Sequence, residues 1–191
     1  MKKHIITLAG KLGSGKSTTA NLLAAKLGYE RASTGDYMRS LADKRGVTLL
    51  ELNQMGEKDL SIDTLLDNYN KEIGEKTDII LDSRIGFHFI PESFKVFLEL
   101  DSSVAASRIL EDAKVNPNRH KEVRGDFDTV EKIAEGINLR AESETKRYRD
   151  MYGIADNMAH ENFDFVVDTG LYTPEEVSNK IIEAYNQWLS G

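Results

Sequence analysis

The sequence predicts an α/β fold that is doubly wound around a parallel sheet of about five strands. Three observations lead to this prediction. An apolar strand pattern runs directly into a glycine-rich loop and a helical pattern, short apolar runs alternate with helical patterns along the chain, and the last helical pattern begins with a strong capping signal. Strands that alternate with helices are typical of βαβ units, in which neighbouring strands run parallel.

The strand predictions rest on short runs of apolar and β-branched residues. The first run, from His4 to Ala9, is bounded by Gly10 and has the pattern of a strand that is buried on both faces. A shorter strand is expected over residues 29–32. Similar runs predict strands over residues 77–81, 94–100 and 163–167.

Helical spacing of apolar residues predicts the helices at the two ends of the chain. Apolar residues recur at this spacing over residues 16–27, and Gly28 follows as a stop signal. The last helix is expected to begin at Thr173, whose side chain can cap it. Pro174 then suits the first helical position, and Glu176 completes a capping box.

Composition indicates a single globular domain and excludes several classes of site. The chain has 191 residues, a net charge of −7 and no cysteine, so disulfides, thiolate metal sites and cysteine nucleophiles are excluded. An acidic chain is a poor generic binder of nucleic acid. The apolar run near the N-terminus, about six residues long, is too short for a signal-peptide core. We expect a cytoplasmic monomer that binds neither nucleic acid nor a membrane.

The glycine-rich loop carries the most specific motif of the chain. The pattern G-x-x-x-x-G-K-[ST] is matched at every fixed position by Gly10, Lys11, Leu12, Gly13, Ser14, Gly15, Lys16 and Ser17. The glycines let backbone N–H groups converge on phosphate oxygens, and the following helix adds the positive end of its dipole. Lys16 is expected to reach the β- and γ-phosphates, and Ser17 to offer its hydroxyl to Mg²⁺. The loop, with Thr18 at its end, is the candidate site for ATP and Mg²⁺.

Two stretches of the chain are longer than a plain crossover between strands. Residues 33–74 carry several helical pieces, and residues 112–155 are highly charged and helical toward their far end. We expect one domain over residues 1–191, in which the first stretch is an acceptor-binding insert and the second is a lid. The core then consists of residues 1–32, 75–111 and 156–191.

A candidate acceptor site follows the second strand. Ser33 or Thr34 can cap a helix that carries Asp36 and Arg39 three residues apart, and therefore on one face. Arginine binds a phosphate group in bidentate fashion, so Arg39 is a candidate for the phosphate of an acceptor, with Asp36 beside it. The alternative is an exposed ion pair between Asp36 and Arg39.

Three more residues extend the candidate acceptor site. Asp82 ends an apolar strand, and α/β sheets bind their ligands at the carboxyl ends of strands. It is a candidate for Mg²⁺ or for the acceptor, and Arg84 is a candidate for the acceptor phosphate. Asp63 opens a helical stretch and is a candidate partner for an exocyclic amino group. The alternatives are a solvated pair at the strand end for Asp82 and Arg84, and an ordinary helix N-cap for Asp63.

The helical pattern that follows residue 128 places Arg140, Glu144 and Arg147 on one face. Arginines inserted into a kinase site stabilise the negative charge of phosphoryl transfer, so Arg140 and Arg147 are candidate catalytic residues. The alternative is a solvated helix with Glu–Arg pairs, such as Glu144 with Arg147. The basic, turn-rich segment 116–124 precedes this helix.

Several of these motifs, taken together, resemble the archaeal-type cytidylate kinases, a family of P-loop nucleoside monophosphate kinases. The resemblance runs in order along nearly the whole chain, through GKLGSGKS, STGDYMR, LDSR, RAESETKRYRDMYGI and FDFVVDTG. It implies a five-stranded parallel sheet of P-loop kinase type with helical acceptor-binding and lid subdomains. It also implies that the glycine-rich loop binds ATP, that Asp36, Arg39 and Arg84 hold the acceptor, and that Arg140 and Arg147 come from the lid side.

The resemblance further implies ATP- and Mg²⁺-dependent phosphoryl transfer to a nucleoside monophosphate, CMP or dCMP, giving ADP and the diphosphate. Such an acceptor presents an ionised phosphate oxygen, so in-line transfer needs positioning and charge stabilisation rather than a strong base. Two alternatives remain. One is a small-metabolite kinase with a hydroxyl acceptor, for which Asp36 is a candidate base, and the other is a regulatory P-loop protein that binds ATP with little turnover.

Overall fold

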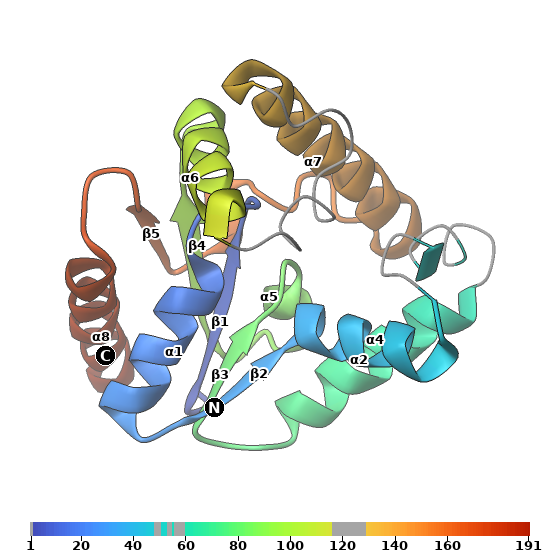
Figure 1. The fold of residues 1–191 in the computed structure, drawn as a ribbon. Coiled ribbons are helices and arrows are strands. Elements are labelled where there is room, and N and C mark those ends of the chain that lie inside the picture. The colour runs from blue at the N-terminus through green and yellow to red at the C-terminus, as the bar shows by residue number, and fades with distance from the viewer. Residues whose placement is uncertain (1, 48–50, 53–54, 56–59, 116–128) are drawn as a thin grey trace.

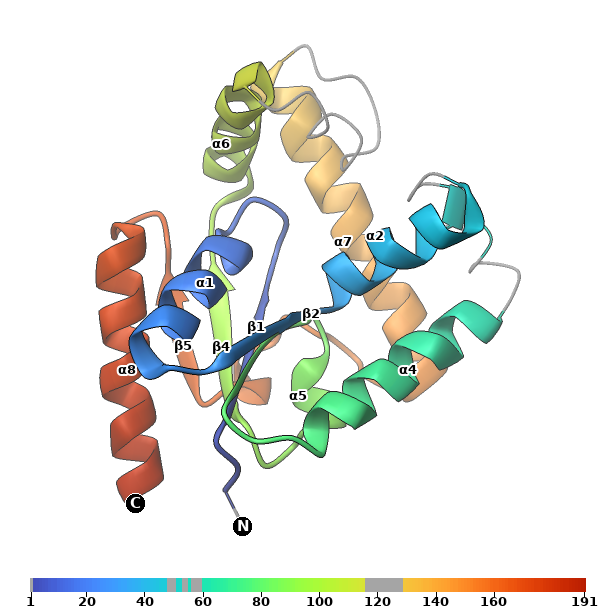
Figure 2. The same ribbon diagram turned by 60° about the horizontal axis from the view of Figure 1, so that its bottom comes forward.

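Helices cover both faces of a five-stranded parallel sheet in the computed structural model of the chain (Figures 1 and 2). The structure describes residues 2–47, 51–52, 55, 60–115 and 129–191. The strand order is β2-β3-β1-β4-β5, and the strands are β1 (Ile5–Gly10), β2 (Glu30–Ser33), β3 (Ile79–Asp82), β4 (Phe94–Glu99) and β5 (Phe165–Asp168). The predicted fold class and all five predicted strands are confirmed.

The helices alternate with these strands along the chain. They are α1 (Lys16–Leu27), α2 (Thr34–Arg45), α4 (Leu60–Gly74), α5 (Gly86–Phe89), α6 (Ser102–Val115), α7 (Val130–Tyr152) and α8 (Pro174–Ser190). The predicted capping box of α8 is present: the Thr173 hydroxyl accepts from the Glu176 backbone, and the Glu176 carboxylate accepts from the Thr173 backbone. None of the described helices combines the length and the apolar character that a membrane span requires.

The three central strands of the sheet, β3, β1 and β4, are largely buried, which explains why they are mainly apolar in sequence. In β1 the side chains alternate between the faces. Ile6 and Leu8 belong to a core cluster with residues of α1 and α8, including Leu23 and Ile181. Ile5 belongs to a second cluster on the other face, with residues of α4 and the segment after α5.

Two helix pairs lie beside the sheet: α2 follows the carboxyl end of β2 and packs on α4, which leads back to the start of β3, and α6 follows the carboxyl end of β4 and packs on α7 (Figures 1 and 2). α2 and α4 pack through Met38, Ala42 and Ile62, and α6 and α7 pack through a cluster that includes Ile109 and Ile137. The first pair lies within the predicted acceptor-binding insert, and α7 lies within the predicted lid region. The functional roles of these two regions stay predictions, and the basic segment 116–124 lies outside the described residues.

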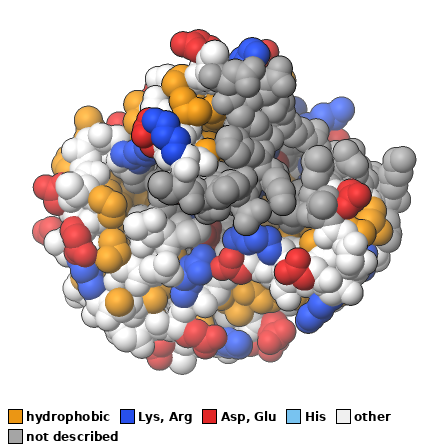
Figure 3. Space-filling view, in the orientation of Figure 1, with side chains coloured by type: hydrophobic (Ala, Val, Ile, Leu, Met, Phe, Trp, Pro, Cys, Tyr) orange, Lys and Arg blue, Asp and Glu red, His pale blue; other side chains and the backbone are white. Residues whose placement is uncertain are grey.

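Acidic and basic side chains are interspersed on the face shown in Figure 3. In a parallel sheet, ligands are expected at the carboxyl ends of the strands, here those of β1, β2 and β3. These three strands are neighbours in the sheet, so the segments that follow them are brought together although they are far apart in the sequence.

Candidate phosphate-binding and acceptor site

The glycine-rich loop connects the end of β1 to the start of α1. Gly10, Gly13 and Gly15 have φ values of 149°, 83° and 82°, which favour glycine. A Cβ atom at Gly10 would lie 2.6 Å from the Leu98 carbonyl oxygen and 2.7 Å from Ser14 Oγ. The N-cap of α1, Gly15, makes no side-chain capping bond, so the first backbone N–H groups of α1 are available to an anion.

Lys16 folds back over this loop. Its Nζ donates to the carbonyl oxygens of Gly10 at 2.8 Å and of Lys11 at 2.9 Å. Burial, followed by repulsion from the Arg84 guanidinium, lowers the pKa of Lys16 to about 8. Burial thus makes the charged form of Lys16 less favourable. A bound anion would offset this free-energy cost, because it would place a negative charge beside the buried ammonium group.

Ser17 and Asp82 meet as the sequence predicts. Ser17, in the first turn of α1, donates its Oγ proton to Asp82 Oδ2 at 3.0 Å. Asp82 ends β3, which pairs directly with β1, and its side chain is only 9% exposed. The interpretation of Asp82 as a solvated residue is therefore wrong. Among the described residues, no group of three or more acidic or histidine side chains is arranged to hold a metal ion.

Asp36 is held between two arginines. Arg39 Nη2 lies 2.5 Å from Asp36 Oδ1, and Arg31 Nη1 lies 3.0 Å from Asp36 Oδ2. Burial alone would raise the pKa of Asp36, but the hydrogen bond from Arg39 and the charge of Arg31 outweigh it and lower the pKa below its ordinary value. Ser33 is the N-cap of this helix, as predicted. The exposed ion pair of Asp36 and Arg39, which the sequence left open as the alternative to an acceptor site, is present, and Arg31 joins it.

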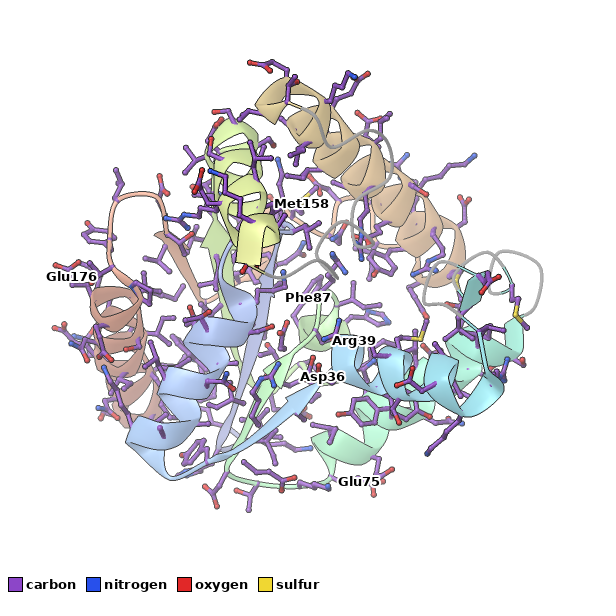
Figure 4. All side chains as sticks on the ribbon, in the orientation of Figure 1. Asp36, Arg39, Glu75, Phe87, Met158 and Glu176 are labelled. Carbon is purple, nitrogen blue, oxygen red and sulfur yellow. The ribbon has the colours of Figure 1, made fainter. Side chains whose placement is uncertain are left out.

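Arg31 also reaches the end of β3. Its Nη2 lies 3.7 Å from Asp82 Oδ2, so one guanidinium links Asp36 on α2 to Asp82 beside Ser17. Figure 4 shows Asp36 and Arg39 in the central part of the molecule, whereas Glu75 and Glu176 lie at its periphery. The sequence analysis missed Arg31, because a single arginine in a short strand carries no local signal.

Arg84 and Arg140 meet on Glu144. Glu144 Oε2 lies 2.7 Å from Arg84 Nε, and Glu144 Oε1 accepts a hydrogen bond of 3.0 Å from Arg140 Nε. The Glu144 side chain is only 17% exposed. A solvated pair at the end of β3 is therefore the wrong interpretation of Arg84, whose side chain is 23% exposed. On α7 a Glu–Arg pair is present, but it joins Glu144 to Arg140, and both side chains are largely buried rather than solvated. The sequence analysis named Glu144 only as a possible surface partner of Arg147.

Asp63 and Arg147 lie opposite each other on α4 and α7. Arg147 Nη1 is 3.9 Å from Asp63 Oδ1. Asp63 lies in the first turn of α4, which begins at Leu60, so the interpretation of Asp63 as the N-cap is wrong. Burial raises the pKa of Asp63 despite the opposing charge of Arg147. The carboxyl group is thus partly desolvated, as expected of a residue that meets a ligand or a packed partner.

Two hollows flank the glycine-rich loop. The first is lined by Gly10, Lys11 and Leu12 from the loop and by Arg84, Arg140 and Glu144. The second lies on the other side and is lined by Gly13, Ser14, Gly15, Thr18, Arg108, Thr169 and Tyr172. Arg108 Nη2 donates to the Thr169 carbonyl oxygen at 2.7 Å, which fixes one wall. No motif in the sequence points to Arg108 or Tyr172, which belong to α6 and to the loop after β5, and FDFVVDTG, which contains Thr169, carries no signal for a binding site.

Known proteins match this chain over most of its length. A family model described as an AAA domain matches residues 6–133. The cytidylate kinase of Natronomonas pharaonis is 37% identical over 187 residues, which cover 96% of this chain and 90% of that protein. The chain belongs to the cytidylate kinase family. The family resemblance that the motifs predict is thereby confirmed.

A longer relative matches this chain over part of its own length. An S-adenosylmethionine-dependent nucleotide dehydratase of Lacinutrix mariniflava is 33% identical over 187 residues, which cover 97% of this chain but 36% of that protein. Among solved structures, shikimate kinase from Acinetobacter baumannii in complex with shikimate superposes with a TM-score of 0.65 at 16% identity, over 97% of this chain and 94% of that chain. This likeness shows the kinase fold alone.

Proposed function

We propose that the chain transfers the γ-phosphoryl group of ATP, with Mg²⁺, to CMP or dCMP, giving ADP and the nucleoside diphosphate. The proposal rests chiefly on the position of Arg31. Its guanidinium links Asp36, beside Arg39, to Asp82, beside Ser17. An acceptor phosphate bound by Arg31 and Arg39 would therefore lie next to the end of the glycine-rich loop where the γ-phosphate is expected. Membership of the cytidylate kinase family supports the same acceptor.

The residues of the loop fit the phosphates of ATP. Ser14 is fully buried, and its Oγ has no hydrogen-bond partner among the described residues, so it can donate to a phosphate oxygen. Gly10 leaves no room for a side chain against Leu98. The Ser14 N–H donates to the Lys11 carbonyl oxygen. The other backbone N–H groups from Gly13 to Thr18 and the Lys16 ammonium complete the donor set. The hollow beside Thr18, with Arg108 and Tyr172 in its walls, suits the nucleoside of ATP.

Ser17 and Asp82 suit Mg²⁺. A hydroxyl and a carboxylate are oxygen ligands, and Mg²⁺ in kinase sites takes one or two protein ligands together with phosphate oxygens and water. When bound, Mg²⁺ would neutralise charge on the phosphates during transfer. The chain itself holds Asp82 in place through Ser17 and through the Arg31 guanidinium.

A hydroxyl acceptor is less well supported, because it requires a general base. Asp36 was the candidate base, but each of its two carboxylate oxygens is in an ion pair with an arginine. Those contacts also lower its pKa, which makes Asp36 a weaker base. An ionised phosphate acceptor needs no base, and we propose that Asp36 orients Arg31 and Arg39 toward it.

Arg84, Arg140 and Arg147 are proposed to act on the charge of the transferred group. Arg84 and Arg140 line the hollow beside Gly10 and Lys11, and Arg147 lies nearer the acceptor side with Asp63. Arginine donors at these places can bind the equatorial oxygens of the transferred phosphoryl group. Closure of the lid region over the site would exclude water and limit hydrolysis of ATP.

The experiment that tests the proposal is ADP release from ATP and Mg²⁺ with a panel of acceptors. The panel contains CMP, dCMP, UMP, AMP, GMP, a hydroxyl acceptor such as shikimate, and no acceptor. We expect strong stimulation by CMP or dCMP. No stimulation by any monophosphate would contradict the proposed acceptor, and equal ATP turnover with and without acceptors would contradict kinase activity.

A further inference from the structure

Glu144 joins two arginines that come from different parts of the fold. Arg84 follows β3, and Arg140 lies on α7, one helical turn before Glu144. The two Glu144 carboxylate oxygens divide between them, with Oε2 at 2.7 Å from Arg84 Nε and Oε1 at 3.0 Å from Arg140 Nε. A single carboxylate therefore fixes one guanidinium from the sheet and one from the helix.

Glu144 contacts both arginines at Nε, and this position determines how the contact restrains each guanidinium group. A guanidinium is planar and carries donors along each of its edges. A contact at Nε restrains rotation of the guanidinium plane. It thereby fixes the direction in which the two Nη groups point. Arg84 and Arg140 line the same hollow as Gly10 and Lys11 of the glycine-rich loop. The Lys16 ammonium group donates to the carbonyl oxygens of these two loop residues, so the restraint acts beside a group that is proposed to bind phosphate.

Charge makes the contact stronger than a neutral hydrogen bond. Burial alone would raise the pKa of Glu144, but the charges of Arg84 and Arg140 outweigh it and hold the pKa below its ordinary value, so the carboxylate is ionised. Lys16 lies in the same environment, where Arg84 and Arg140 repel it and Asp82 and Glu144 attract it. The negative charge of Glu144 thus offsets the repulsion among Lys16, Arg84 and Arg140 in the absence of a bound phosphate.

We propose that Glu144 is a positioning residue that orients Arg84 and Arg140 toward the phosphoryl group during transfer. This inference rests on the proposed function, because it assigns the two arginines to phosphoryl transfer. Glu144 itself would touch neither substrate. Its effect is pre-organisation: without the carboxylate, the two guanidinium groups would have to be ordered during each turnover.

The kinetic test compares Glu144→Gln with a matched control. Gln keeps the volume of the side chain but offers one oxygen and an N–H₂ group, so residue 144 can then accept from only one of the two arginines. We expect kcat to fall at least ~10-fold while KM for ATP changes less than ~3-fold, because the lost interaction acts in the transition state. The control, Glu142→Gln, removes the same charge from an exposed position of the same helix and should stay within ~2-fold of wild type. Equal kcat values for the two variants would overturn the proposal.

A second measurement observes the arginines without turnover. The Nε–Hε NMR signals of Arg84 and Arg140, assigned by their loss in Arg84→Lys and Arg140→Lys, should exchange slowly with water in the wild-type protein. They should exchange faster in Glu144→Gln and not in Glu142→Gln. Fast exchange in the wild type would overturn the contact. If the wild-type protein phosphorylates no monophosphate, the proposed function fails, and these signals still decide whether Glu144 holds the two guanidinium groups.

Discussion

Replacement of Arg31 by methionine is expected to weaken binding of the acceptor much more than it lowers the stability of the fold. Methionine keeps much of the apolar stem of arginine but removes the guanidinium that lies 3.0 Å from Asp36 and 3.7 Å from Asp82. The variant therefore tests whether Arg31 is the cation that joins the acceptor site to the phosphate loop.

The stability cost of Arg31→Met is expected to be small. The Asp36 side chain is 49% exposed, so its pair with Arg31 contributes about 0.5–1 kcal/mol to the free energy of unfolding. Asp82 is 9% exposed, and the loss of a nearby cation there costs about 1–2 kcal/mol. Removal of Arg31 Nε, which is buried without a partner among the described residues, offsets about 1 kcal/mol. The net loss of about 1 kcal/mol corresponds to a fall in Tm of about 2–4 °C.

The effect on the acceptor is expected to be larger. A hydrogen bond between an arginine and a phosphate contributes about 1.5–3 kcal/mol, and each 1.4 kcal/mol is a factor of about ten in affinity. KM for CMP at saturating ATP should therefore rise about 10- to 100-fold, whereas KM for ATP should change less than about 3-fold, because the glycine-rich loop is intact.

The assay is steady-state ADP release with CMP and with ATP varied in turn, together with thermal unfolding. Arg45→Met is the matched control, because Arg45 is exposed at the C-terminal end of α2, the helix that follows β2, and lies outside the site. An unchanged KM for CMP, or equal rises in both KM values, would refute the assignment of Arg31 to the acceptor phosphate.

Three further variants test other parts of the structure. Lys16→Ala should lower kcat at least ~1,000-fold with Tm nearly unchanged, and near-normal turnover would contradict the role of the loop. Gly10→Ala should weaken binding of a fluorescent ATP analogue at least ~10-fold, because its Cβ would lie 2.6 Å from the Leu98 carbonyl oxygen; unchanged binding would show that the loop can relax. Thr173→Ala removes the capping box of α8. It should lower the free energy of unfolding by about 1 kcal/mol and Tm by about 2–4 °C, with kcat unchanged. An unchanged Tm would contradict this role of the cap.

The sheet and the glycine-rich loop could be predicted because their signals are local. A strand that is buried on both faces must be apolar along its length, and β1, β3 and β4 show this in the sequence. The loop requires glycines at φ values near 80° and beyond, followed directly by Lys16 and Ser17 at the start of α1. Asp82 was also predicted, because a residue that ends a parallel strand lies at the edge where ligands bind.

The partners of the predicted residues could not be read from their spacing. On α2, spacing gives the pair of Asp36 with Arg39, but Arg31 joins it only because β2 lies beside β3. On α7, spacing offers Glu144 as a surface partner of Arg147, whereas the fold places Glu144 against Arg84 of another segment. For Asp63 the sequence left a helix N-cap open as the alternative to a ligand contact, but α4 begins before Asp63, which lies opposite Arg147.

The sequence by itself thus determined the fold class, the phosphate loop and the family, because each depends on residues that are adjacent or regularly spaced along the chain. Only the tertiary structure decided which charges meet. Parallel strands bring their carboxyl ends to one edge, and the helices that leave this edge pack back over it. Segments as distant as β2, β3 and α7 therefore contribute Arg31, Asp82 and Glu144 to one site.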